Sequence, residues 1–183
     1  MIGDVHAHQT SQGGTRGVAD LGRHAQGDGD RVGYVSVGIL RDLIDEAYEF
    51  LTHHLIPHAV AEDEVLYPAV ARLMGASEAT ATMSRDHVEV EKLTQELSAL
   101  RAHLAATTPG DLQAKTLRRN LYALHALISL HFATEEEVYL PILDARLSEG
   151  EAAGVFARME EAEHVARGRA AEHAVPGSRS LRA

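Results

Sequence analysis

Two segments of this chain repeat one arrangement of histidine, acidic residues and proline. The first, HAVAEDEVLYP, begins at His58 and places Glu62 four residues later, and the second, HFATEEEVYLP, begins at His131 and places Glu135 four residues later. In an α-helix, residues four apart lie on the same face, because each residue turns the helix by about 100°. Two such helices facing each other would bring two imidazoles and two carboxylates to one internal point.

The composition favours an all-α fold. The chain has 183 residues, of which 45% are hydrophobic, enough for one domain with a sizeable core. Alanine, leucine and glutamate dominate, and glycine and proline are scarce in the middle of the chain. We therefore expect an up-and-down antiparallel four-helix bundle, in which side chains from facing helices meet at the centre.

The spacing of hydrophobic residues predicts where the four helices lie. The expected helices are residues 36–74, residues 77–106, a third that begins at residue 111 and whose apolar stripe continues to Ile142, and residues 149–173. We expect Pro57 to kink the first helix, Asp111 to cap the third, and Ser148 with Glu151 to form a capping box at the start of the fourth.

The two ends of the chain differ in composition from its middle. Residues 1–33 contain many glycines among polar residues, so we expect a mobile, glycine-rich arm there. The helical domain is predicted to span residues 34–174, followed by a tail over residues 175–183.

Charge and cysteine content exclude several classes of function. A formal net charge of -10 makes nucleic acid and anionic membrane surfaces poor partners, because such binding depends on clustered lysine and arginine. The absence of cysteine excludes disulfides, iron-sulfur clusters and thiolate zinc sites. We find no apolar run long enough to span a bilayer and no signal-peptide pattern, so we expect a cytoplasmic protein without a membrane segment.

The two repeats place charged groups on faces that should be buried. An unpaired carboxylate in an apolar core costs at least roughly several kcal/mol, so something must neutralise Glu62 and Glu135. One interpretation is a polar network in a metal-free helical module, in which each histidine and glutamate bond to their neighbours. The other is a pair of metal ions, which would offset two carboxylates while neutral imidazoles complete the coordination.

The repeats resemble the helix signature of the hemerythrin-like family, also called the HHE cation-binding domain. The matching residues are His58, Glu62, Asp63 and the Leu66-Tyr67-Pro68 stretch, and again His131, Glu135, Glu136 and the Tyr139-Leu140-Pro141 stretch. The resemblance covers about residues 36–146. It implies a non-haem centre of two iron ions, with Glu62 and Glu135 as bridging ligands and His58 and His131 as terminal ligands. Asp86 and His87 resemble the family's single histidine in an acidic context.

One histidine of the family pattern has no clear counterpart, because the region before the first HxxxE helix is the glycine-rich arm. We prefer His54 as the substitute, since it lies one predicted turn before His58. His24 in the arm is a second candidate. As a third route, the C-terminal helix could take the place of the missing helix, with Glu163 turned inward and His164 turned away. The predicted metal ligands are thus His54, His58, Glu62, His87, His131 and Glu135.

Four other polar residues near these positions are assigned smaller roles. We expect His125 to bond at the edge of its helix and Glu91 to be a solvated edge residue. Tyr67 and Tyr139 are expected to be core aromatics whose hydroxyls are hydrogen-bonded.

Three functions are compatible with this pattern. The first is a di-iron protein that binds dioxygen, peroxide or nitric oxide for sensing, delivery or detoxification. The second is a catalase- or peroxidase-like enzyme at the same site, with a glutamate or histidine moving protons. The third is the metal-free interaction module, for which a chelator would leave thermal unfolding unchanged.

Overall fold

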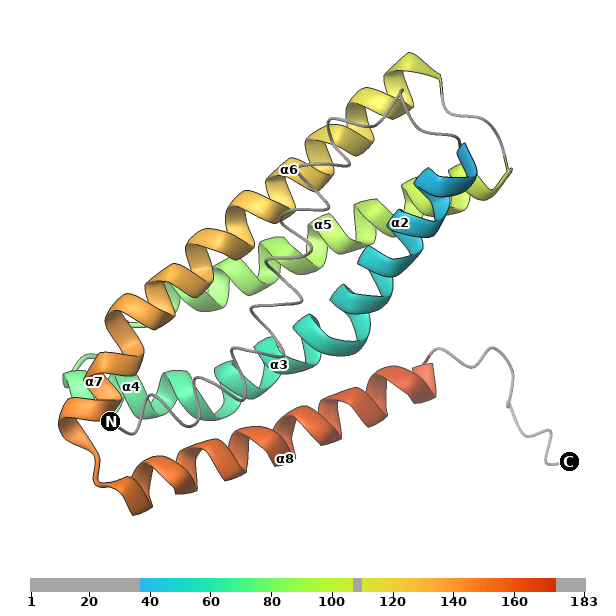
Figure 1. Ribbon diagram of the computed structural model, residues 1–183. Coiled ribbons are helices and arrows are strands. Elements are labelled where there is room, and N and C mark those ends of the chain that lie inside the picture. Colours follow the sequence, from blue (N-terminus) through green and yellow to red (C-terminus); the bar gives the residue numbers. More distant parts are fainter. Residues whose placement is uncertain (1–36, 107–109, 174–183) are drawn as a thin grey trace, which may run out of the picture.

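A computed structural model of the protein describes residues 37–106 and 110–173, and every regular element in these ranges is helical (Figure 1). The elements of the first half are α2 (Val37–Phe50), η1 (Leu51–Leu55), α3 (Ile56–Ala61), η2 (Glu62–Leu66), α4 (Tyr67–Met74) and α5 (Ala81–Ala106). Those of the second half are α6 (Asp111–Thr134), η3 (Glu135–Tyr139), α7 (Leu140–Arg146) and α8 (Glu149–His173). None of the described helices combines the length and apolar character needed to cross a membrane. The predicted arm and tail lie outside the described residues.

Elements α2 to α4 follow one another without a break, as do α6 to α7, so the described chain forms four long helices. The three η elements are π turns inside them, and each is followed, after one residue, by Pro57, Pro68 or Pro141. The residue before each proline donates its N–H to the carbonyl five residues earlier, as Tyr67 does to Glu62. A proline in a regular α-helix clashes with the carbonyl four residues before it, and a π turn is the wider local geometry that accommodates the ring.

The predicted bend at Pro57 is present. Figure 1 shows the first long helix changing direction between α2 and α3, where η1 and Pro57 lie. Proline and a π turn are two recognised causes of sharp helix bends, and here they occur together.

Two of the predicted helix starts were wrong by a few residues. Residues 77–80 form turns, and α5 begins at Ala81 rather than at Ser77. The third long helix has Gly110 as its N-cap, in extended conformation, and Asp111 is its first helical residue. An aspartate there still interacts favourably with the positive end of the helix dipole, which explains why the same residue suits both positions.

The predicted end of the first long helix and the predicted capping box of the fourth are confirmed. Gly75 ends the first long helix in the left-handed conformation with φ 70°, which an L side chain adopts at a cost. The capping box before α8 is complete: Ser148 Oγ donates to Glu151 Oε2 over 2.7 Å, and the Ser148 N–H donates to the same oxygen over 2.9 Å.

The apolar core consists of two clusters. The first is formed by α2, η1, α5 and α6, and it includes Ile44, Leu97 and Leu124. The second joins all four long helices, and it includes Val70 and Val155. Helix α8 packs mainly against α3 and the neighbouring π turns of the first long helix. Polar residues of the two repeats lie between the clusters, as described next.

Candidate metal centre

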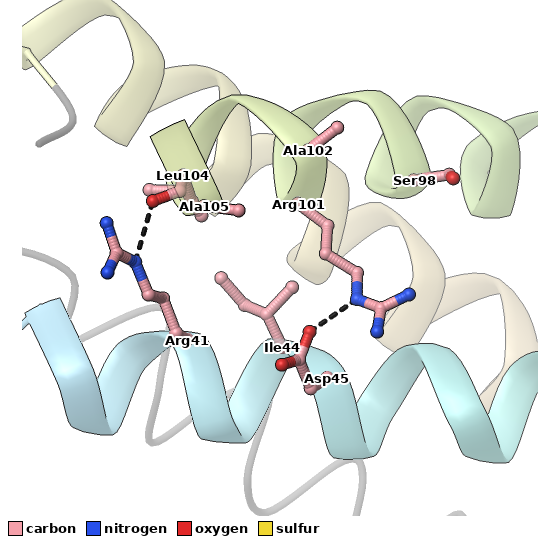
Figure 2. A pocket seen from close by; sticks show the side chains of 8 residues that line it. All are labelled: Arg41, Ile44, Asp45, Ser98, Arg101, Ala102, Leu104 and Ala105. Atoms are coloured by element: carbon pink, nitrogen blue, oxygen red, sulfur yellow. Dashed lines mark hydrogen bonds and ion pairs between the residues drawn. The ribbon is translucent and has the colours of Figure 1, made fainter. Parts of the chain in front are cut away.

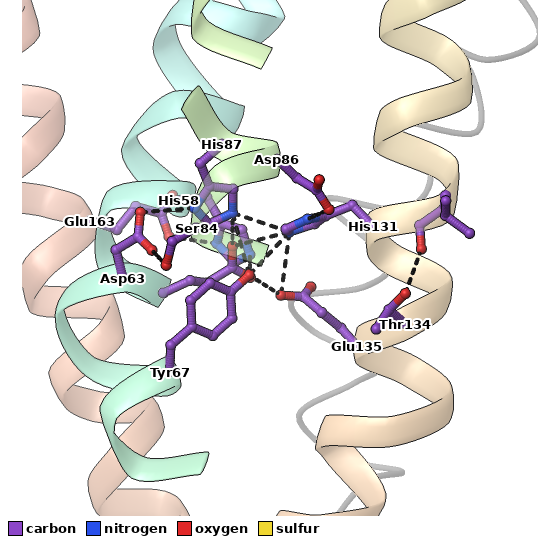
Figure 3. Close-up of polar contacts among 12 residues, drawn as sticks. His58, Asp63, Tyr67, Ser84, Asp86, His87, His131, Thr134, Glu135 and Glu163 are labelled. Carbon is purple, nitrogen blue, oxygen red and sulfur yellow. Dashed lines mark hydrogen bonds and ion pairs between the residues drawn. The ribbon is translucent and has the colours of Figure 1, made fainter. Parts of the chain in front are cut away.

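Three side chains from three of the long helices meet inside the bundle. Glu62 comes from η2, His87 from α5 and His131 from α6, and one ligand-type atom of each lies within 4.8 Å of the other two. His87 Nε2 is 3.1 Å from His131 Nε2 and 3.2 Å from Glu62 Oε2, while His131 Nε2 is 3.9 Å from that oxygen. Figure 3 shows the two histidine rings turned toward each other. Within the described ranges, this is the one such group of metal-ligating side chains.

Glu62 divides its two carboxylate oxygens between different histidines. Oε2 faces His87 and His131, whereas Oε1 lies 3.0 Å from Nε2 of His58. His58 and Glu62 therefore share a helix face, as their spacing predicts. A carboxylate with histidines on both sides has the arrangement needed to bridge two cations, as in carboxylate-bridged metal pairs of helix bundles.

The second repeat contributes Glu135, and with it a tyrosine hydroxyl enters the group. Glu135 Oε1 lies 3.5 Å from His131 Nε2 and accepts a hydrogen bond of 2.8 Å from the Tyr67 hydroxyl. That hydroxyl is also 3.1 Å from His131 Nε2 and 3.3 Å from His87 Nε2, and the Tyr67 ring stacks on His87. Tyr67 is thus a member of the polar group as well as of the core.

The carboxylates in this group are buried, and their pKa values reflect both burial and their neighbours. Glu62 is 3% exposed and Glu135 is 6% exposed. Burial alone would raise the pKa of Glu62, but the charge of His58 and hydrogen bonds from the surrounding histidines hold this pKa well below its ordinary value. Burial, together with repulsion from Glu62, raises the pKa of Glu135. Glu135 therefore takes up a proton at a higher pH than Glu62 does.

The histidines respond in the opposite direction. Burial would lower the pKa of His131, but Glu135 and Glu62 raise it to about 10. Burial would likewise lower the pKa of His58. The charge of Glu62 outweighs this effect and raises the pKa well above its ordinary value. The neighbouring carboxylates thus favour the protonated form of these two histidines.

The group fits a cation by its donor set and by its spacing. It offers imidazole nitrogen and carboxylate oxygen atoms, a mixture that suits iron, manganese and zinc. For metal-to-ligand bonds of about 2.1 Å, two ligand atoms at right angles are about 3.0 Å apart, close to the two shorter separations found here. His131 Nδ1 is buried without a hydrogen bond, and Asp86 Oδ2 lies 3.5 Å away. A metal ion bound at Nε2 of His131 would favour a proton on Nδ1, directed at the carboxylate of Asp86.

Five of the six predicted ligands lie in or beside this group, and His54 does not. His54 is exposed, and its ring stacks on Phe50 of the preceding turn. The prediction assumed regular α-helical spacing between His54 and His58. His54 lies inside the π turn η1, where the backbone departs from regular α-helical spacing. The alternative candidate His24 lies outside the described residues.

The other polar residues weighed from the sequence lie where they were expected, and Tyr67 takes part in the polar group as well. His125 lies at the edge and its Nδ1 is 3.2 Å from Ser129 Oγ, while Glu91 is exposed. His164 is exposed, whereas Glu163 is turned inward, with Oε2 3.6 Å from Nδ1 of His58. Tyr67 was predicted only as a core aromatic with a hydrogen-bonded hydroxyl. Its place in the polar group follows from the π turn, because its N–H bonds to the carbonyl of Glu62, five residues earlier.

Of two hollows lined by residues that the structure describes, one touches this group and the other does not. An open groove of about 540 Å³ at the α4–α5 turn is lined in part by Asp63, Tyr67 and Ser84. The other, of about 290 Å³, lies between α2 and the end of α5, where Arg41 Nε donates to the Leu104 carbonyl (Figure 2). The second hollow has no histidine in its lining, so it offers no comparable metal site.

The family model of the hemerythrin HHE cation binding domain matches this chain over residues 15–143. Comparison with curated proteins and with solved structures finds no match. The matched range begins inside the predicted arm and includes His24, and it ends before α8. Because the match covers most of the sequence and includes both HxxxE repeats, the chain belongs to the hemerythrin HHE cation-binding domain family.

Proposed function

We propose that this protein holds two iron ions and uses them to bind dioxygen or a related small ligand, such as peroxide or nitric oxide. The observation that carries the proposal is the division of the Glu62 carboxylate, with Oε1 facing His58 and Oε2 facing His87 and His131. One carboxylate with histidines on both sides calls for two cations rather than one.

Within this proposal, each side chain has a defined task. His58 serves one ion, and His87 and His131 serve the other. Glu62 is the shared ligand, and Glu135 supplies a second carboxylate. When bound, the two ions supply a redox-active centre for the small ligand. The buried carboxylates and the surrounding apolar clusters hold the ligands in place and limit the entry of water.

Tyr67 supports binding of a small, polar ligand at this position. Burial and the charges of Glu62 and Glu135 raise the pKa of Tyr67, so the hydroxyl keeps its proton. It lies within 3.3 Å of Nε2 of both His87 and His131. While the Tyr67 hydroxyl donates to Glu135, its oxygen can still accept a hydrogen bond. Rotation of the O–H would instead let the hydroxyl donate to a ligand held between these groups.

The same hydroxyl favours peroxide turnover as the second candidate function. Cleaving an O–O bond requires a proton for the departing oxygen, and the Tyr67 hydroxyl, hydrogen-bonded to Glu135, can relay one while remaining neutral itself. An open groove lined in part by Asp63, Tyr67 and Ser84 borders this group on the side of the α4–α5 turn.

The two functions are separated by experiments on iron-loaded wild-type protein. Binding alone predicts an ultraviolet-visible spectrum that shifts on adding azide, and at most one equivalent of peroxide consumed per centre. Turnover predicts continued release of dioxygen from peroxide without loss of iron. Protein that takes up no iron from anaerobic Fe(II) would contradict both and would support the metal-free module.

A further inference from the structure

The three histidines of the centre share an arrangement that extends beyond the ligand-type atoms. Each turns Nε2 toward the centre and Nδ1 toward an outer carboxylate. His87 Nδ1 is 2.9 Å from Asp63 Oδ2, and His131 Nδ1 is 3.5 Å from Asp86 Oδ2. Nδ1 of His58 also faces an outer carboxylate, which belongs to a helix that carries none of the other ligand-type residues.

That carboxylate is Glu163, on α8. Its Oε2 lies 3.6 Å from His58 Nδ1, and both side chains are partly buried, with 22% and 23% of their surfaces exposed. Figure 3 shows Glu163 reaching His58 from outside the group formed by the other helices. Helix α8 lies outside the residues that match the family, so the family match does not assign this contact.

The position of Glu163 is fixed by its own helix. Met159, one turn earlier, is buried in the second core cluster, and Ala162 packs against the same cluster. On the solvent side, Arg167 forms an ion pair with Glu163 one turn later. Glu163 therefore lies between a packed helix face and a guanidinium, and its carboxylate is held facing α3.

We propose that Glu163 is a positioning residue for His58: its carboxylate accepts the Nδ1–H of His58 and thereby leaves Nε2 free to bind a metal ion. This inference rests on the proposed function. A carboxylate bonded to the outer nitrogen of a metal-binding histidine fixes the ring orientation and the tautomer, and it makes the inner nitrogen a stronger ligand. Helix α8 thus completes the centre from outside the family's matched range.

The test compares the anaerobic Fe(II) affinity of wild-type protein with that of Glu163→Ala and Glu163→Gln, by competition with a chromophoric chelator. Loss of an outer partner typically lowers metal affinity by about 10- to 100-fold, and we expect a loss of this size in Glu163→Ala. Because His58 serves one ion, the loss should fall on one of two binding steps. Glu163→Gln should lose less, since its amide oxygen still accepts a hydrogen bond.

The matched control is Glu160, an exposed acid on the same helix, three residues earlier. Glu160→Ala and Glu160→Gln remove the same charge from α8 and should leave both binding steps unchanged. Thermal unfolding of each metal-free variant, followed by circular dichroism, shows whether α8 remains folded. A loss of affinity in a variant that unfolds like wild type supports the inference.

A second measurement reports on His58 directly. In protein loaded with Zn²⁺, which is diamagnetic, ¹⁵N resonances of His58 should show a proton on Nδ1 in wild type. In Glu163→Ala that proton should exchange faster with water. Wild-type affinity and wild-type His58 resonances in Glu163→Ala would overturn the inference while leaving the proposed function intact. Failure of wild-type protein to bind any metal would overturn both.

Discussion

Glu62 illustrates how this bundle tolerates a carboxylate in its interior. The side chain is almost fully buried, and histidines lie within 3.9 Å of its oxygens on both sides. A buried carboxylate of this kind is stabilised either by protonated histidines or by bound metal ions. The metal-free and metal-bound states exclude each other, because a metal ion must displace the histidine protons. The chemistry of the site therefore depends on this residue more than on any other.

The residue-scale prediction for Glu62 concerns the number of ions bound. Glu62→Gln keeps the shape of the side chain but removes the charge and one of the two acceptor oxygens. We expect this variant to retain at most one iron per chain and to keep its helical content, as measured by metal analysis and circular dichroism. Glu91→Gln changes an exposed acid near His87 and should bind as wild type does. Wild-type iron content in Glu62→Gln would show that Glu62 is not shared.

Tyr67 gives a second prediction at this scale. Tyr67→Phe leaves the buried Glu135 oxygen without its donor, which should cost about 1–3 kcal/mol of unfolding free energy in metal-free protein. It should also alter the azide-induced spectral shift of the iron-loaded form. Tyr139→Phe is the matched control, because the Tyr139 hydroxyl donates to the Ala79 carbonyl, 3.0 Å away, and not to the centre. An identical azide shift in wild type and Tyr67→Phe would contradict a role for this hydroxyl in ligand binding.

Individual residues also show where sequence reasoning succeeds. His58 and Glu62, like His131 and Glu135, meet as predicted because regular α-helical backbone lies between the two members of each pair. Periodicity also predicted the inward turn of Glu163. Its contact with His58 could not be predicted, because the packing of α8 against α3 depends on the whole fold.

At the scale of elements, the π turns mark where the structure departs from the faces that regular helical spacing predicts. One residue separates each π turn from the proline that follows it, and each turn changes which residues share a helix face. His54 lies in η1 and is exposed, whereas η2 places Tyr67 on the face of Glu62. Helical periodicity alone does not reveal such turns, but a proline inside a strongly predicted helix is a usable signal for them.

The capping box before α8 supports a prediction at this scale. Ser148→Ala removes a side chain that bonds to Glu151, and it should destabilise the protein by about 1 kcal/mol in urea unfolding. Hydrogen bonds from the backbone and side chain of Ser148 lower the pKa of Glu151. A lowered pKa contributes stability above the pKa of the unfolded chain, and this contribution is lost as pH falls through the folded value. Ser148→Ala should therefore show a smaller loss of stability on acidification.

The control for this prediction is Ser129→Ala, which changes an exposed serine within α6. This variant loses only the exposed contact between Ser129 Oγ and His125 Nδ1, and alanine is the better helix former, so it should be about as stable as wild type. Equal stability of Ser148→Ala and wild type at neutral pH would contradict a stabilising capping box.

At the scale of the molecule, the candidate centre lies between two apolar clusters. One is built by α2, η1, α5 and α6, and the other by all four long helices. The helical class and the order of the helices followed from composition and apolar spacing. The meeting of Glu62, His87 and His131 required the fold, because the three residues are far apart in the sequence.

This arrangement predicts that metal binding stabilises the whole bundle, because the ligands come from three of its long helices. A ligand present at about 100 times its Kd stabilises a folded protein by about 2.7 kcal/mol, and each ion should add a contribution of this kind. Thermal unfolding of iron-loaded protein should therefore occur at a higher temperature than after chelation, measured by circular dichroism in the same buffer. The metal-free module predicts no difference.

The most direct test of the central claim is the iron content of wild-type protein after anaerobic loading with Fe(II) and removal of unbound metal. A Glu62 carboxylate shared between two ions predicts about two irons per chain, as in other carboxylate-bridged helix bundles. It also predicts that both ions are lost together or in sequence on titration with chelator. A content of one iron per chain would contradict the shared carboxylate, and a content of zero would contradict the metal centre itself.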